Sequence, residues 1–175
     1  AQNPDKSWKK NTFSTTKSKK FPTSIVGDSL FIHKNYTKVL YKGIQDSPLN
    51  KDDSYVYSDL SFMLYPEIVK RATGESFETY LNNHFYHALG ANTLTFNPKK
   101  FIDINKIVPT ERDTFFRQTL LHGQVHDEAA AMMGGISGHA GLFGNANDVM
   151  KVWQMYLQNG FYGGKQYIEE STIFE

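Results

Sequence analysis

The stretch Tyr57-Ser58-Asp59-Leu60-Ser61-Phe62 stands at the start of a helical pattern and decides how the fold is interpreted. Apolar residues in and after it follow the spacing of an amphipathic helix, namely Leu60, Met63, Leu64 and Ile68. Ser58 or Asp59 can cap the first turn, and Gly74 can close the last. Pro66 lies inside the pattern, where it removes a hydrogen bond, so we expect a kink there. Tyr57 is therefore expected at the entrance of a helix.

The rest of the chain also favours helices joined by long loops. Helices are predicted from apolar spacing and caps at 37–45, after Ser76, at 126–133, and after Asn145 or Asn147. A short strand or a buried turn is expected at 31–32, an extended segment at 94–96, a loop at 107–110, and a short helix or turn at 115–121. The expected fold class is mainly α, with long loops and little sheet.

Composition limits the classes of function. The chain has 175 residues, 39% of them hydrophobic, which suits one globular domain. A formal net charge of +1 gives no electrostatic case for a nucleic-acid partner. No stretch is long and apolar enough to span a membrane, and no apolar signal-peptide core is visible at the start. The absence of cysteine excludes disulfides and thiolate metal sites.

The two ends of the chain differ from its middle. Residues 1–20 are polar and lysine-rich, with only Trp8 and Phe13 as apolar anchors, and we place the end of this segment at residue 22. We interpret them as a solvated basic arm or loop, in preference to a patch for an anionic polymer. At the other end, Ser171 resembles an N-cap with no room for its helix. We therefore expect residues 23–175 to be the folded part, truncated at both ends.

Histidines and glycines form a second group of candidate functional residues. His122 and His126 are spaced to share a helix face, and Asp127 could complete a metal site. Gly123 weakens that helix and no His-Glu-x-x-His order is present, so we predict no metal and no other cofactor. The glycines of 134–144 lack the Lys-Ser/Thr of a phosphate-binding loop and are better explained by close backbone packing.

The stretch 57–62 together with Arg71-Ala72-Thr73-Gly74 and Leu89-Gly90 resembles serine β-lactamase-like, penicillin-binding-protein-like hydrolases of the class C type. That resemblance implies the helical subdomain of an α+β fold, with Tyr57 and Asp59 as catalytic residues. These enzymes combine a Ser-x-x-Lys nucleophile, a Tyr-x-Asn element and a Lys-Thr-Gly or His-x-Gly strand, and this chain carries only the second. Asp59 replaces the usual Asn, which puts β-lactam hydrolysis in doubt more than the fold.

The run from Gly123 to Phe143 resembles one subgroup, whose domains follow a glycoside hydrolase family 3 N-acetylglucosaminidase module in bacterial envelope proteins. In that resemblance His126, Asp127 and His139 line or brace the substrate cleft. The alternative reading, a polar network that holds a loop, is at least as well supported, because buried His and Asp side chains usually satisfy backbone groups. We expect the three residues to converge near Tyr57.

Two functions from different classes remain open. The first is a fragment of a serine acyl hydrolase (β-lactamase, esterase or DD-peptidase type) that acts on an amide or ester of the cell wall. It would be inactive alone, because the Ser-x-x-Lys matches at Ser7 and Ser14 lie in the polar arm. The second is a non-catalytic helical module that binds peptidoglycan fragments or scaffolds a glycosidase. Both imply the bacterial envelope or periplasm, with a small-molecule or peptidoglycan-derived substrate and the rest of the parent chain as partners.

Overall fold

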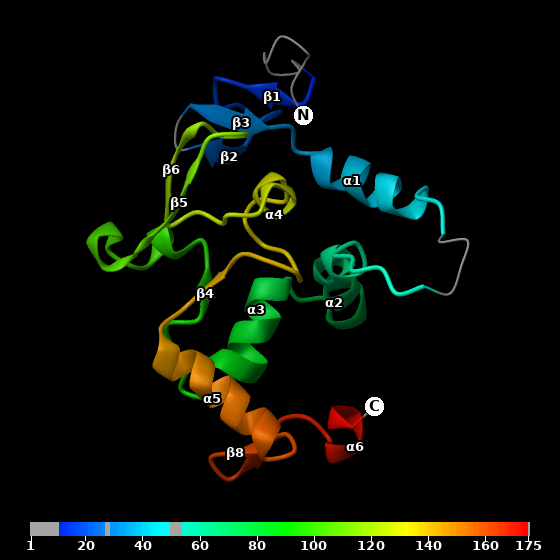
Figure 1. Cartoon of the computed structure of the whole chain (residues 1–175), viewed down its shortest axis with the longest axis vertical. Helices are drawn as coiled ribbons and strands as arrows, with labels where there is room; N and C mark the ends of the chain where they lie inside the picture. Colours follow the sequence, from blue (N-terminus) through cyan, green and yellow to red (C-terminus); the bar gives the residue numbers. More distant parts are fainter. Residues whose placement is uncertain (1–10, 27–28, 50–53, 175) are drawn as a thin grey trace.

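The computed structural model describes residues 11–26, 29–49 and 54–174. A small sheet and a hairpin lie at one end of the molecule (Figure 1). At the other end lie α5 (Ala146–Leu157), β8 (Phe161–Tyr162) and α6 (Glu170–Ile173). The space between these ends holds α2 (Tyr65–Thr73), α3 (Phe77–Leu81) and α4 (Glu128–Met132), and α1 (Tyr36–Gln45) extends from the sheet toward α2. Within the described residues no helix is long and apolar enough to cross a membrane.

The N-terminal sheet has the antiparallel order β1-β3-β2, formed by β1 (Phe13–Ser14), β2 (Thr23–Val26) and β3 (Leu30–Ile32). Its core cluster contains Phe13, Ile25, Leu30, Ile32 and Phe116. Phe13 is thus a buried anchor within the segment expected to be a solvated arm. Trp8, the other proposed anchor, lies outside the described residues.

A β-hairpin replaces two of the elements expected from the sequence. β5 (Pro109–Asp113) pairs antiparallel with β6 (Thr119–His122). The loop expected at 107–110 therefore enters a strand at Pro109, and the short helix or turn expected at 115–121 was wrong for residues 119–121. The pairing is a tertiary contact between two strands, which the spacing of apolar residues within either segment does not reveal.

The helices around the Tyr57 stretch follow local signals, with one correction. α1 spans Tyr36–Gln45, α2 spans Tyr65–Thr73 and ends at Gly74 in the left-handed conformation, and α3 spans Phe77–Leu81. A 3-10 turn at Phe62–Leu64 precedes α2. Pro66 lies in the first turn of α2, where no hydrogen bond is lost, so the kink expected there was wrong. Ser76 caps α3 by accepting the backbone N–H of Thr79.

The C-terminal half begins with a π-helical turn at Asn82–Tyr86 and two 3-10 turns at Pro98–Lys100 and Ile104–Lys106. β4 (Thr95–Phe96) pairs with β7 (Leu142–Phe143), and α4 spans Glu128–Met132. α5 (Ala146–Leu157) is capped by Asn145, whose side chain accepts the backbone N–H of Asp148. Its buried Met155 packs in a second core cluster with Tyr86, Leu89, Ala91 and Leu94.

The chain continues through a hairpin of β8 (Phe161–Tyr162) and β9 (Lys165–Gln166) to α6 (Glu170–Ile173). Glu169 holds the cap position of α6, so Ser171 lies inside this short helix, and its expected N-cap role was wrong. Every sheet in the described part of the chain has two or three strands. The expected assignment to the helical subdomain of an α+β fold remains a proposal.

Candidate functional site

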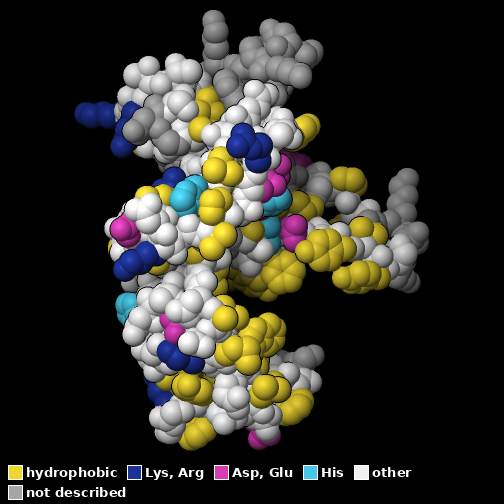
Figure 2. Space-filling view, turned by 60° about the vertical axis from the view of Figure 1, so that its left-hand side comes forward, with side chains coloured by type: hydrophobic (Ala, Val, Ile, Leu, Met, Phe, Trp, Pro, Cys, Tyr) yellow, Lys and Arg dark blue, Asp and Glu magenta, His cyan; other side chains and the backbone are white. Residues whose placement is uncertain are grey.

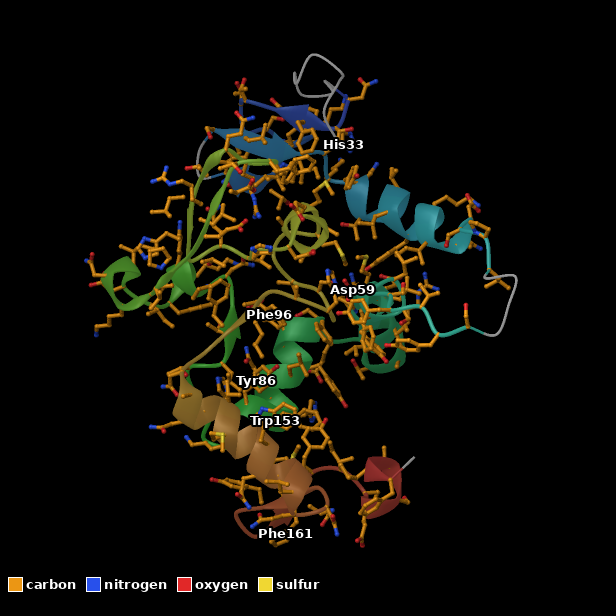
Figure 3. The ribbon with its side chains drawn as sticks, viewed as in Figure 1. His33, Asp59, Tyr86, Phe96, Trp153 and Phe161 are labelled. Atoms are coloured by element: carbon orange, nitrogen blue, oxygen red, sulfur yellow. The ribbon has the colours of Figure 1, made fainter. Side chains whose placement is uncertain are left out.

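Tyr57 lies in an irregular segment just before the 3-10 turn that leads into α2. Its side chain is 77% exposed, whereas Met63, six positions later, is buried and anchors the turn. Ser58 stabilises the entrance, since its Oγ accepts the backbone N–H of Leu60 over 3.2 Å. Asp59 lies beside the start of α2 (Figure 3). The phenol is therefore open to solvent, as expected from the sequence, while its catalytic role stays a prediction.

The Asp59 carboxylate determines the protonation of this phenol. Its negative charge, and then its hydrogen bond to the hydroxyl, raise the pKa of Tyr57 above the ordinary value of 10.0. The sequence suggested that a neighbouring cation could lower this pKa, but the neighbour in the structure has the opposite charge. Tyr57 is therefore a neutral phenol at neutral pH, able to donate a proton.

Asp127 and His139 converge, and Ser137 joins them. His139 Nε2 lies 2.8 Å from Asp127 Oδ1, and its Nδ1 lies 2.8 Å from Ser137 Oγ. Asp127 also caps α4 by accepting the backbone N–H of Ala130. Burial alone would raise the pKa of Asp127, but the hydrogen bonds from Ala130 and His139 outweigh it and lower the pKa. The three side chains tie the start of α4 to the loop that follows it.

Gly138 brings this loop against the Tyr57 stretch. A Cβ added to Gly138 would overlap the carbonyl oxygen of Phe62 and would lie 2.9 Å from Cδ2 of Tyr65. Only a glycine permits so close an approach of two backbones. The two motifs that carried the family resemblance are therefore in contact. On the face shown in Figure 2, histidine and acidic side chains lie beside a group of hydrophobic ones.

His126 and His122 are not part of the network of Ser137, His139 and Asp127. His126 Nδ1 lies 3.0 Å from Glu111 Oε2, and its side chain is 62% exposed, so the expected convergence with Asp127 and His139 was wrong for His126. His122 lies in β6, where its Nε2 bonds to the carbonyl oxygen of Ile107. Within the described ranges, no three His, Asp or Glu side chains gather as a metal-holding group.

A buried ion pair that the sequence did not predict supports the segment that carries Asp127. Arg117 Nε donates to Asp113 Oδ2 over 2.9 Å, and both side chains are almost completely buried. The same guanidinium donates to the carbonyl oxygens of Val125 and His126, immediately before Asp127. The opposite charges four positions apart were the available signal. This clamp holds the hairpin to the segment that presents Asp127.

Hydrogen bonding decides the charge state of Asp113. Burial alone would raise its pKa, but the Arg117 side chain and the backbone N–H groups of Arg117, Phe116 and Phe115 lower the pKa to about 2. Asp113 is therefore ionised at neutral pH, where the clamp is an ion pair, and it loses this charge only as the pH falls toward about 2.

The serines of the described residues differ in their access to a substrate. Ser137, His139 and Asp127 have the order of a hydrolase triad, yet Ser137 is only 3% exposed, which leaves its Oγ unavailable for attack. Ser14 lies in strand β1, and its Oγ bonds to the backbone of Thr16. Ser7 lies outside the described residues. The network of Ser137, His139 and Asp127 is suited to hold a loop in place.

Comparison with known proteins assigns residues 23–170 to the family described as Beta-lactamase. A protein of Escherichia coli (strain K12) named "Putative D-alanyl-D-alanine carboxypeptidase" is 37% identical over 131 residues, which cover 68% of this chain and 30% of that protein. Proteins of the same name from Salmonella agona and Salmonella schwarzengrund are 30% and 31% identical over 167 residues, 87% of this chain. The chain spans 30% to 38% of the length of these relatives.

Proposed function

This chain belongs to the β-lactamase family, and we propose on that premise that it is the helical subdomain of an α+β serine acyl hydrolase. The substrate class is an amide or ester of the bacterial cell wall. The relatives support this, because their name refers to cleavage of D-alanyl-D-alanine. The nucleophilic serine and its lysine are supplied by the rest of the parent protein, and the chain alone is inactive.

Tyr57 acts as the acid in this proposal. The serine Oγ attacks the substrate carbonyl carbon while the lysine accepts the serine proton. When the bond to the leaving group breaks, the Tyr57 hydroxyl gives its proton to the leaving nitrogen or oxygen, and the protonated lysine restores that proton to Tyr57. Because its pKa is raised, the phenol of Tyr57 stays protonated until the leaving group takes its proton. Asp59 orients the phenol through its hydrogen bond.

The contact between Gly138 and Phe62 is the single observation that carries the proposal. It joins the Tyr57 stretch to the loop containing His139, although the two are far apart in the chain. The buried network of Ser137, His139 and Asp127 fixes that loop. We propose that Asp127 and His139 brace the rim of the substrate cleft next to Tyr57, and that His126 meets only the outer part of a substrate.

The test compares Tyr57→Phe with Tyr55→Phe in the full-length protein that contains this chain. Both side chains are strongly exposed tyrosines in the same segment, so each substitution removes one hydroxyl without a change in packing. The assay is release of D-alanine from a peptide that ends in D-Ala-D-Ala, with a p-nitrophenyl ester as second substrate. Tyr57→Phe is expected to lower kcat by about 10²-fold or more, the usual contribution of an acid–base group.

Equal activity of the two variants, or equal loss in both, would refute the role of Tyr57. Turnover by the isolated chain that disappears in Ser14→Ala would show that Ser14 is the nucleophile and that the chain is not inactive alone. Binding of peptidoglycan fragments by the full-length protein without hydrolysis would instead support the second candidate function, a non-catalytic binding or scaffold module. Asp59 in place of Asn favours that alternative, because a carboxylate cannot donate a hydrogen bond to a substrate carbonyl.

We also propose that the parent protein carries a glycoside hydrolase family 3 module and works in the cell envelope or periplasm. The run from Gly123 to Phe143 supports the fusion, and the names of the relatives support a place of action at peptidoglycan. Mass spectrometry of the native protein, with peptides mapped upstream of residue 1, tests the fusion directly.

A further inference from the structure

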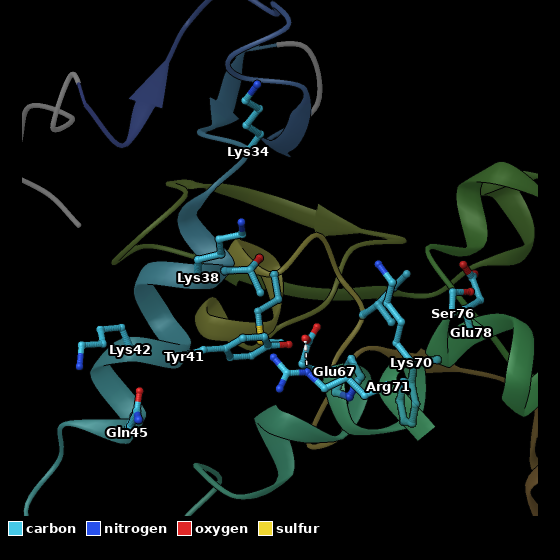
Figure 4. A pocket seen from close by; sticks show the side chains of 15 residues that line it. Lys34, Lys38, Tyr41, Lys42, Gln45, Glu67, Lys70, Arg71, Ser76 and Glu78 are labelled. Carbon is cyan, nitrogen blue, oxygen red and sulfur yellow. Dashed lines mark hydrogen bonds and ion pairs between the residues drawn. The ribbon is translucent and has the colours of Figure 1, made fainter. Parts of the chain in front are cut away.

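A pocket of about 710 Å³ lies between α1 and α2, apart from the Tyr57 stretch (Figure 4). This volume falls within the range of roughly 300–1,000 Å³ that is typical of small-molecule sites. Its apolar walls come from Tyr41, Pro66, Phe77, Met133 and Ile136. These residues belong to α1, α2, α3 and the segment after α4, so four parts of the chain build the pocket.

The side chains around the pocket carry an excess of positive charge. Its lining includes five basic residues, Lys34, Lys38, Lys42, Lys70 and Arg71, against the two acids Glu67 and Glu78. All five basic residues are exposed, so a ligand can reach them without displacing the core. The whole chain is nearly neutral, with a formal net charge of +1, so this concentration of cations is local.

Two of these cations already have partners. Lys42 pairs with Asp46 over 2.7 Å, and Arg71 pairs with Glu67 over 2.6 Å, as the dashed lines of Figure 4 mark for the second pair. Both pairs are solvent-exposed and therefore exchange readily for a ligand carboxylate. Lys38 and Lys70 make no ion pair within the described ranges, although they face the same pocket from two helices.

Glu78 adds a charge of the opposite sign. It contributes to the lining of the pocket, while its Oε1 is buried out of reach of a ligand and has no hydrogen-bond partner in the described structure. The carboxylate of Glu78 therefore disfavours a compact inorganic anion on its side of the pocket.

We propose that this pocket binds a short acidic peptide. Its carboxylates meet Lys38, Lys70 and Arg71, and its aliphatic parts lie on Tyr41 and the other apolar walls. An inorganic anion would leave the apolar walls uncovered and would be repelled by Glu78. This binding site is independent of the proposed hydrolysis, because none of its lining residues belongs to the Tyr57 stretch.

The test is calorimetric titration of this chain with acetylated triglutamate, triglutamine amide and inorganic phosphate. Triglutamate is expected to bind, and to bind less tightly as salt rises, because the contacts are between exposed charges. Triglutamine amide and phosphate are expected to bind at least tenfold more weakly. The double variant Lys38→Gln/Lys70→Gln is expected to raise the Kd for triglutamate at least tenfold, with an unchanged melting curve because both lysines are exposed.

Lys100→Gln is the matched control, since Lys100 is equally exposed but lies outside the pocket. An equal loss in this variant would mean non-specific attraction and would overturn the site. Equal affinity for triglutamate and phosphate, or no binding of triglutamate, would also refute the proposal.

Discussion

Replacement of Asp113 by Asn should destabilise this chain strongly and in a pH-dependent way. Asp113 accepts four hydrogen bonds, from the backbone N–H groups of Phe115, Phe116 and Arg117 and from Arg117 Nε. An asparagine offers one acceptor oxygen and turns its amide donors toward a guanidinium that also only donates. Arg117 would then be a buried cation without its anion.

The shift in the pKa of Asp113 gives the expected size of this destabilisation. The pKa of Asp113 falls from 3.8 to about 2 on folding, which corresponds to about 2–3 kcal/mol of folding free energy. Because the folded pKa is the lower one, this contribution is complete above the unfolded pKa of 3.8 and disappears as pH falls through about 2. Loss of one partner of a buried pair commonly costs about 3–5 kcal/mol. We expect Asp113→Asn to lose about 3 kcal/mol at pH 7, with most of the difference gone near pH 2.

Urea denaturation at pH 7, 4 and 2, followed by circular dichroism, measures these differences. Asp46→Asn is the matched control, because Asp46 also pairs with a cation four positions away but is exposed to solvent. Its cost should stay below about 1 kcal/mol, as for other exposed pairs. Two outcomes would refute the reasoning. One is a loss of unfolding free energy in Asp113→Asn that stays constant with pH. The other is a loss no larger than that of Asp46→Asn.

Three further outcomes follow from the packing. Gly138→Ala should cost about 1–3 kcal/mol in a thermal melt, because its Cβ overlaps the carbonyl oxygen of Phe62, whereas Gly43→Ala in α1, with open space around it, should stabilise the chain. His139→Ala should cost about 1–3 kcal/mol by urea denaturation, since it leaves two hydrogen-bonded partners unsatisfied, and a neutral result would show that water replaces the imidazole. Asn145→Ala should cost about 1 kcal/mol in the same assay through loss of the α5 cap, and an unchanged midpoint would contradict that cap.

The elements that could be predicted were those with local signals. Ser76, Asn145 and Gly74 each act on backbone groups within a few positions, so they marked helix ends correctly. The β5–β6 hairpin could not be predicted in the same way, because its strands are defined by pairing with each other. The apolar spacing predicted that the helix begins several positions before residue 65, so Pro66 was expected in its interior. The helix begins at Tyr65, which puts Pro66 in its first turn.

The same difference between local signals and long-range contacts explains which parts of the candidate site could be predicted. The proximity of Asp127 and His139 was expected, because polar side chains in a glycine-rich loop need partners. The sequence could not show that His126 turns toward Glu111, because that partner lies on the other side of a hairpin the spacing did not reveal. The link from Arg117 to the segment before Asp127 was hidden for a related reason: its two acceptors there are backbone carbonyls, which every residue has.

The contact between Gly138 and Phe62 affects when the site can assemble during synthesis of the chain. The two residues are more than 70 positions apart, so the Tyr57 stretch leaves the ribosome long before the loop that packs against it. Until residue 138 has been synthesised, the side chain of Tyr65 has no loop beside it, and it is still 43% exposed in the finished chain. The site therefore assembles late in biosynthesis, and a chain stopped before residue 138 should be retained by chaperones that bind exposed hydrophobic segments.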